Sequence, residues 1–281
     1  DAVLAAAIKR IDQSLQQLSR YGLVQDIAAI AARIRPTTDL AQAVESAGFV
    51  VEAVPEDLAL KQTLFADLER LALSDAILAT NSSGLPIAES AAHVKNKARV
   101  VGSHFFLPAQ IIPLVEVSRG AETSEETMQW VYDHWRACGK EPIRIEKDLP
   151  GYVANRMQGA LVREATHLLA EGVANAEDID KAVRVGFGIR YATMGLIEFI
   201  DWGGVDILYY ASNYLKDALP DPRFEPPPVI AEMMENGRRG MREGQGFYDF
   251  REMDVAAYQR DMLARFVRLL SHMELLAAPA D

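Results

Sequence analysis

The chain has 281 residues, of which 49% are hydrophobic and 25% are charged, and this composition excludes a disordered protein. Its net charge of −11 makes nucleic acid and an anionic membrane surface poor partners, so we expect neither. Cys138 is its only cysteine, which excludes a disulfide scaffold and a cysteine-based zinc site. We therefore expect a cytoplasmic protein without a bound metal.

The first half of the chain alternates between helical and strand patterns. Residues 1–20 carry apolar side chains at spacings of three and four, which predicts an amphipathic helix. The short apolar segments that follow alternate with helices and indicate an open α/β sheet that is largely parallel. The predicted strands are 49–54, 76–79, 99–103, 112–117 and 142–145, with helices after Pro55 and over about 123–138.

The pattern changes near residues 147–151, a segment that contains Pro150 and Gly151. Beyond it the chain is mostly helical, so we expect two domains, 1–147 and 148–281. The helices predicted in the second domain are about 153–172, 176–186, 194–216 and 254–276.

The beginning of the chain is unusual for a doubly wound sheet. Such folds place a glycine-rich phosphate-binding turn after their first strand. The sequence contains no G-x-G-x-x-G, and it opens on a helix. Two interpretations stay open: a strand–helix–strand unit precedes Asp1, or this α/β protein never had one.

His104 and Glu116 are candidates for acid–base chemistry. His104 ends a predicted strand, where ligands bind in open α/β sheets, and Glu116 interrupts an apolar strand 12 residues later. A carboxylate that fixes the tautomer of a histidine makes a good general base. Alternatively, Glu116 faces water at a sheet edge and His104 is an ordinary turn histidine.

Other polar residues allow two interpretations each. Ser83 lies in the polar turn 80–84, which either faces a ligand or caps the next helix. Glu56 and Lys61 follow the first predicted strand and are either site residues or surface charges. Asn155, among apolar neighbours early in a helix, needs polar partners if it is half-buried.

Several motifs, taken in their order along the chain, resemble the L-3-hydroxyacyl-CoA dehydrogenase family, and in particular its short-chain 3-hydroxybutyryl-CoA type. The resemblance covers almost the whole chain. The motifs are Val51-Glu52-Ala53-Val54-Pro55-Glu56 with Lys61, Thr80-Asn81-Ser82-Ser83, Gly102-Ser103-His104-Phe105-Phe106-x-Pro108, Pro113-Leu114-Val115-Glu116-Val117, Lys147-Asp148-x-Pro150-Gly151-Tyr152-Val153-x-Asn155-Arg156, Glu177-Asp178-Ile179-Asp180, Met194-Gly195 and Gly244-x-Gly246-Phe247-Tyr248.

The resemblance implies a Rossmann-type NAD domain followed by a helical domain that builds a homodimer. It implies NAD-dependent oxidation of a short-chain L-3-hydroxyacyl-CoA, as in β-oxidation of fatty acids. It also implies that the first strand–helix–strand unit, with the glycine-rich turn, lies upstream of Asp1. On that basis we expect the chain from Asp1 onward not to bind NAD productively.

The resemblance also assigns roles to individual residues. His104 would be the catalytic base and Glu116 its partner, while Ser83 and Asn155 would hold the substrate's oxygen atoms. The cofactor would contact Glu56, Lys61, Ser83 and Arg242, and Ser14 would touch the CoA nucleotide.

Some positions depart from the acyl-CoA pattern. Leu107 replaces the family's usual Asn, and Gly84 its usual Ser. The segment 186–195 is longer than the acyl-CoA turn and is more similar to the carnitine and gulonate dehydrogenases, which act on free 3-hydroxy acids. Arg190 is then either a partner for a substrate carboxylate or a helix C-terminal cation. A non-catalytic, crystallin-like protein is a further alternative.

Overall fold

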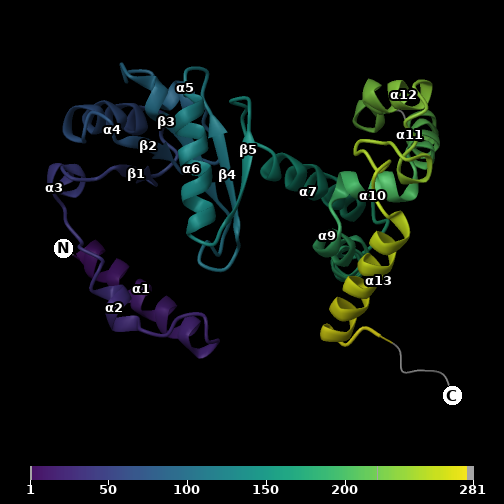
Figure 1. Cartoon of the computed structure of the whole chain (residues 1–281), viewed down its shortest axis with the longest axis horizontal. Coiled ribbons are helices and arrows are strands. Elements are labelled where there is room, and N and C mark those ends of the chain that lie inside the picture. The colour runs from purple at the N-terminus through teal and green to yellow at the C-terminus, as the bar shows by residue number, and fades with distance from the viewer. Residues whose placement is uncertain (1, 220, 277–281) are drawn as a thin grey trace. The chain divides into compact units, whose positions relative to one another are not determined.

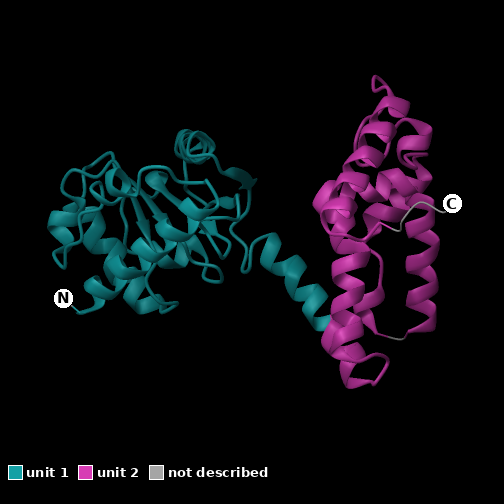
Figure 2. Ribbon diagram, turned by 90° about the horizontal axis from the view of Figure 1, so that it is seen from below, with its two compact units in different colours: residues 1–163 teal, residues 164–281 magenta. Residues whose placement is uncertain are grey.

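The computed structural model describes residues 2–219 and 221–276, which form two compact units. The first unit contains residues 1–163 and the second contains residues 164–281, coloured teal and magenta in Figure 2. The α/β first part and the helical second part that the sequence predicts are both confirmed. The point of division lies within the helix α7 (Ala154–Ala170), so the boundary at 147/148 stays a prediction.

The first unit is built on a five-stranded sheet in which neighbouring strands are also neighbours in sequence (Figure 1). Its strands are β1 (Phe49–Glu52), β2 (Ile77–Thr80), β3 (Val100–Phe105), β4 (Leu114–Arg119) and β5 (Glu141–Ile145). Three of the four strand pairs are parallel, as expected, but β3 and β4 are antiparallel. Only residues 106–113 connect them, and a parallel crossover needs a dozen residues or more.

Helices cover both faces of this sheet, which explains its nearly continuous apolar strands. Side chains of α4 (Leu58–Leu71) and α5 (Ile87–Ser90) pack with Leu78 and Val100 on one face. Met128 and Val131 of α6 pack with Val101, Val115 and Val117 on the other. The helices of the first unit are α1 (Ala2–Arg20), α2 (Ile27–Ala31), α3 (Leu40–Val44), α4 (Leu58–Leu71), α5 (Ile87–Ser90) and α6 (Glu125–Ala137), together with the first turns of α7.

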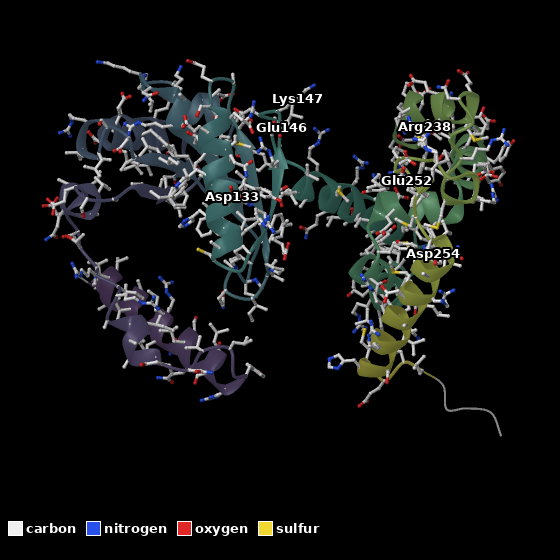
Figure 3. The ribbon with its side chains drawn as sticks, in the orientation of Figure 1. Asp133, Glu146, Lys147, Arg238, Glu252 and Asp254 are labelled. Carbon is white, nitrogen blue, oxygen red and sulfur yellow. The ribbon has the colours of Figure 1, made fainter. Side chains whose placement is uncertain are left out.

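Local signals set where the longer helices begin. The side chain of Asp57 accepts a hydrogen bond from the Leu60 N–H and caps α4, and Ser124 caps α6 through the Thr127 N–H. On the solvent side, Glu146 is the residue after β5 and is labelled in Figure 3. It pairs with Arg144 and Arg119. Exposed ion pairs of this kind contribute little stability, so the two packed faces hold the sheet together.

The second unit is helical, but its helices are more broken than the sequence predicts. The helix expected over 194–216 is interrupted at Gly204, whose φ of 105° is accessible mainly to glycine. The helix expected over 176–186 continues through a wider turn at Val183–Phe187. The α-helices are α8 (Ala176–Ala182), α9 (Gly188–Thr193), α10 (Leu196–Gly203), α11 (Val205–Ala218), α12 (Pro228–Glu235) and α13 (Val255–His272).

A buried acid on α10 holds the glycine-rich turn of the second unit in place. Asp201 accepts hydrogen bonds from the backbone N–H groups of Phe247 and Tyr248 at 2.9 and 2.8 Å. A Cβ on Gly246 would lie 2.0 Å from the Asp201 carboxylate, so this position needs glycine. Within residues 2–219 and 221–276, no helix is long and apolar enough to span a membrane.

Candidate active site

The carboxyl ends of β1, β2 and β3 lie at one edge of the sheet and surround a cavity of about 640 Å³. This is the edge at which open α/β sheets bind ligands. Five residues that the sequence singles out line it together: Glu56, Lys61, Ser83, His104 and Asn155. The remaining lining residues are Ala53, Val54, Pro55, Asn81, Phe105, Phe106, Leu107, Ala109 and Gln158.

His104 and Glu116 form a buried pair across β3 and β4. They are directly opposite in the antiparallel register, and His104 Nδ1 lies 2.8 Å from Glu116 Oε2. Glu116 has an exposed fraction of 0% and His104 one of 6%. The alternative in which Glu116 faces water at a sheet edge is therefore wrong. The short antiparallel connection brings two residues 12 apart in sequence face to face.

The hydrogen bonds of Glu116 determine which histidine nitrogen is free. Its second oxygen, Oε1, accepts from the backbone N–H groups of Val153 and Ala154 at 3.0 and 2.9 Å. A carboxylate only accepts, so Nδ1 of His104 is the donor in this bond, and in the neutral imidazole Nε2 is then the acceptor. The pair is therefore arranged to take up a proton.

Glu56 is held at the cavity by the turn after β2. Ser82 Oγ donates to its carboxylate at 2.8 and 3.0 Å, and the Ser83 N–H donates at 2.7 Å. Partial burial raises the pKa of Glu56, but these hydrogen bonds and the nearby Lys61 charge outweigh burial and leave the pKa lowered. The turn that the sequence marks as either ligand-facing or capping thus holds a carboxylate at the cavity, and Ser82 Oγ also accepts from the Leu85 N–H.

A buried ion pair supports this wall of the cavity, and sequence reasoning did not single it out. Lys61 Nζ donates to both oxygens of Glu52 at 2.8 and 3.0 Å, and Thr80 Oγ1 donates to Glu52 at 2.6 Å. Both charged side chains are almost completely buried. The signal for it was an acid at the end of an apolar strand with a lysine nine residues later. Because its charge is matched by Glu52, Lys61 is a rigid part of the wall.

Asn155 and Ser83 both line this cavity. Asn155 lies in the first turn of α7, next to the backbone groups that bind Glu116, and it is half-buried, as the sequence indicates. Ser83 Oγ lies 3.4 Å from Glu56. Leu107, which stands where the family has Asn, also lines the cavity and is 88% exposed.

Three other predicted residues lie elsewhere. Ser14 lines a separate recess of about 490 Å³ with Arg10 on α1 and Gln110 on the turn after β3. In the second unit, Arg242 pairs with Asp206 at 3.0 Å, and the Arg190 guanidinium lies over a phenylalanine ring, 4.0 Å from its centre. In the described part of the chain, no group of three or more His, Cys, Asp or Glu side chains is arranged to hold a metal ion.

Two family models divide the chain between them. Residues 1–149 match the NAD-binding domain of 3-hydroxyacyl-CoA dehydrogenase, and residues 151–250 match its C-terminal domain. The chain belongs to the 3-hydroxyacyl-CoA dehydrogenase family. Its cofactor is NAD, in keeping with the matched domain.

Relatives of this family differ in the substrates that their names carry. A 5-formyl-3-hydroxy-2-methylpyridine 4-carboxylate 5-dehydrogenase of Mesorhizobium japonicum is 32% identical over 97% of this chain and 89% of its own length. A probable 3-hydroxybutyryl-CoA dehydrogenase of Bacillus subtilis is 34% identical over 88% of this chain and 85% of its own. The crystal structure of a 3-hydroxyacyl-CoA dehydrogenase from Archaeoglobus fulgidus is 29% identical, with a TM-score of 0.78 over 94% of this chain and 88% of that one.

The cavity of this 3-hydroxyacyl-CoA dehydrogenase family member fits the nicotinamide–ribose part of NAD. The Glu56 carboxylate, with its lowered pKa, could accept hydrogen bonds from ribose hydroxyls, and the Ser83 hydroxyl lies beside it. The apolar side chains of Val54, Pro55 and Phe106 offer surfaces against which a flat ring can pack.

Proposed function

We propose that the protein oxidises the 3-hydroxyl group of a short-chain L-3-hydroxyacyl-CoA to the 3-ketoacyl-CoA, with His104 as general base. The observation that carries this proposal is the buried His104–Glu116 pair beside a cavity that Ser83 and Asn155 also line. A secondary alcohol must lose a proton and a hydride together. The histidine suits the first task, and bound NAD would supply the hydride acceptor that the second task needs.

In this mechanism each residue of the candidate site has a distinct task. His104 Nε2 accepts the proton of the 3-hydroxyl while Glu116, bonded to Nδ1, stabilises the imidazolium that forms. Ser83 and Asn155 hold the substrate's oxygen atoms, so the hydroxyl points at the histidine. Glu56 and Lys61 keep the nicotinamide–ribose side of the cavity in place, and Ser83 is shared between cofactor and substrate.

A second candidate is a dehydrogenase of a carboxylic acid that carries no CoA, of the carnitine or gulonate type. It is favoured by the Mesorhizobium relative, which matches more of this chain than the Bacillus relative and whose name specifies a pyridine carboxylate. Arg190 would then bind the substrate carboxylate. Among the described residues its side chain makes no ion pair and only the ring contact, so its charge is available.

Steady-state kinetics with the full-length protein separates the two candidates. NADH formation is followed with 3-hydroxybutyryl-CoA, carnitine, gulonate and a pyridine carboxylate bearing a formyl group. A kcat/KM at least about 10-fold higher for the CoA ester supports the first proposal. A preference for a free acid supports the second, and the absence of turnover on any of them supports the crystallin-like alternative.

The variant Arg190→Ala adds a direct test of the second candidate. It removes only the turnover of free acids if Arg190 binds their carboxylate, because a CoA ester lacks that group. Arg184→Ala, in the wider turn before α9, is the matched control. Loss of CoA-ester turnover in Arg190→Ala contradicts this role.

The same proposal covers the localisation of the protein, its oligomeric state and the residues that would bind the rest of the substrate and cofactor. We propose a cytoplasmic homodimer formed through the helical second part, in which exposed apolar residues of α11 such as Ile207, Tyr210 and Tyr214 are available for contact. Ser14 and Arg10 would receive the CoA nucleotide, and Arg242 the cofactor. Light scattering coupled to size-exclusion chromatography tests the dimer.

A further inference from the structure

Two residue pairs lie next to each other on one face of the sheet, at the junction of β3 and β4. His104 opposes Glu116, and Gly102 opposes Ser118, two residues along each strand. Side chains two residues apart point to the same face of a strand. The pair that we propose for catalysis therefore has a second, uncharged pair directly beside it.

Tyr152 covers both pairs. It is 4% exposed, and its ring centre lies 5.8 Å from the centre of the His104 imidazole. Its φ is +46°, directly after Gly151 with φ +76°. A bulky residue adopts this left-handed conformation only where its surroundings compensate for the strain. The ring lies against the histidine in this conformation, and α7 begins two residues later at Ala154.

The hydroxyl group of Tyr152 lies beside that of Ser118. Both oxygen atoms are buried, and neither makes a hydrogen bond of normal geometry within the described residues. Burial raises the pKa of Tyr152 to about 12, and the adjacent Ser118 hydroxyl partly opposes that rise. The phenol therefore stays neutral at any working pH, and Ser118 is its polar neighbour.

Gly102 provides the space that this arrangement needs. A Cβ at position 102 would lie 2.0 Å from Ser118 Oγ. With no side chain opposite it, the Ser118 hydroxyl keeps its place beneath the tyrosine. Glycine in the middle of a buried strand weakens the strand, and here its absence of a side chain makes room for the hydroxyl pair.

The residues after Tyr152 complete the connection to the catalytic pair. The N–H groups of Val153 and Ala154 both donate to Glu116 Oε1, which leaves Oε2 for His104. The direction of these two N–H groups depends on the backbone of residue 152. The Tyr152 side chain thus contacts His104 directly, and the two peptide groups that follow Tyr152 bind the Glu116 carboxylate.

We propose that Tyr152 is a positioning residue, which holds the His104 imidazole and the Glu116 carboxylate in their working orientation, with Ser118 as its buried polar neighbour. This inference rests on the proposed function, because it assigns the pair a catalytic role. Tyr152 does not line the cavity, so it acts through the pair and touches no substrate.

The test compares Tyr152→Leu, Tyr152→Phe, Ser118→Ala and the Tyr152→Phe/Ser118→Ala double variant of the full-length protein. In Tyr152→Leu, we expect kcat to fall roughly 10-fold while KM for NAD changes less than about 2-fold. Tyr152→Phe and Ser118→Ala should each lower kcat by about 2-fold to 3-fold. Because the two hydroxyls are buried neighbours, their effects should not add, and the double variant should be no worse than either single one.

A second readout does not need turnover. In ¹⁵N-histidine NMR spectra, the His104 ring signals are identified by their loss in His104→Gln, and their shifts report the tautomer. We expect the Nδ1–H form in the wild type and a mixture of tautomers in Tyr152→Leu, with Tyr152→Phe in between. If Tyr152→Leu does not fold, Tyr152→Phe and Ser118→Ala carry the test.

The outcomes separate this inference from the proposed function. An unchanged tautomer together with an unchanged kcat in folded variants would overturn the role of Tyr152, as would additive effects of the two hydroxyl deletions. A wild type without NAD-dependent turnover instead contradicts the proposed function, and the tautomer comparison then decides the positioning role by itself.

Discussion

Two buried carboxylates, one in each unit, hold the polypeptide in the same way. Glu116 accepts the N–H groups of Val153 and Ala154, and Asp201 accepts those of Phe247 and Tyr248. In each case a carboxylate far away in sequence binds two consecutive peptide groups. Such charge-assisted hydrogen bonds are stronger than neutral ones, and they offset the cost of burying a charge.

The difference between the two lies in their remaining acceptor capacity. Asp201 uses one oxygen for each N–H group, so both of its oxygens serve the backbone. Glu116 uses a single oxygen for both, and the other faces the imidazole of His104. Under the proposed function, the same arrangement takes part in catalysis where one oxygen is left for a titratable group beside a cavity. The following predictions test that distinction.

The largest effect is expected for His104→Gln. Without an imidazole nothing accepts the proton of the substrate hydroxyl, so turnover of the full-length enzyme should fall at least ~100-fold, the usual scale for a general base. The measurement is kcat from NADH absorbance. His93→Gln, which alters an exposed histidine outside the cavity, is the control and should leave kcat unchanged. Near-normal turnover in His104→Gln would remove this residue from the mechanism.

Glu116→Gln should also damage catalysis, by at least about 10-fold in kcat, with a smaller loss of stability. The amide oxygen can still accept the two N–H groups, but the amide nitrogen is a donor and forces His104 into the other tautomer. The comparison of kcat with the urea midpoint separates the two effects. A variant that unfolds easily but turns over normally would make Glu116 a purely structural residue.

Asp201→Asn should show the reverse behaviour, with a clear loss of stability and little change in kcat. Its amide nitrogen would face a backbone N–H, which loses a hydrogen bond and leaves a buried donor, at a cost of about 1–3 kcal/mol in the free energy of unfolding. Urea denaturation measures this loss, and kcat per folded molecule should stay within about 2-fold of the wild type. A large loss of kcat with normal stability would contradict the contrast with Glu116.

The smallest effect concerns the pH dependence of stability at Glu56. Its pKa is lowered in the folded protein from its ordinary value of 4.5. The lowered pKa therefore contributes stability that is present above this value and is lost as the pH falls through the folded-state pKa. Wild type should be more stable than Glu56→Gln at neutral pH, and the difference should shrink during acid titration. A difference that grows toward low pH would contradict the sign of the shift.

Much of the fold could be predicted because its strands and helices are amphipathic or uniformly apolar. The predicted strands overlap all five observed ones, since each is a short apolar run between turn residues. The antiparallel β3–β4 pair follows from a connection too short for a crossover, and the strand pattern alone does not reveal it. The break at Gly204 was missed although the sequence carries a signal for it, because Gly203 and Gly204 are consecutive and a Gly-Gly pair favours a turn inside a helical pattern.

For the candidate site, the sequence by itself determined which residue types were available and roughly where each strand ends. His104 and Glu116 stood out because one ends an apolar strand and the other interrupts one, while the site roles of Ser83 and Asn155 came from the family resemblance. Periodicity reports only the face on which a side chain lies. It contains no information about partners distant in sequence.

Only the tertiary structure decided how those residues are paired. The antiparallel register puts His104 opposite Glu116, and the start of α7 supplies the two N–H groups that occupy the other carboxylate oxygen. The Glu52–Lys61 ion pair and the place of Tyr152 over Ser118 likewise depend on contacts between separate elements. Burial and hydrogen bonding turn ordinary polar side chains into a site, and both arise only when the strands and helices pack.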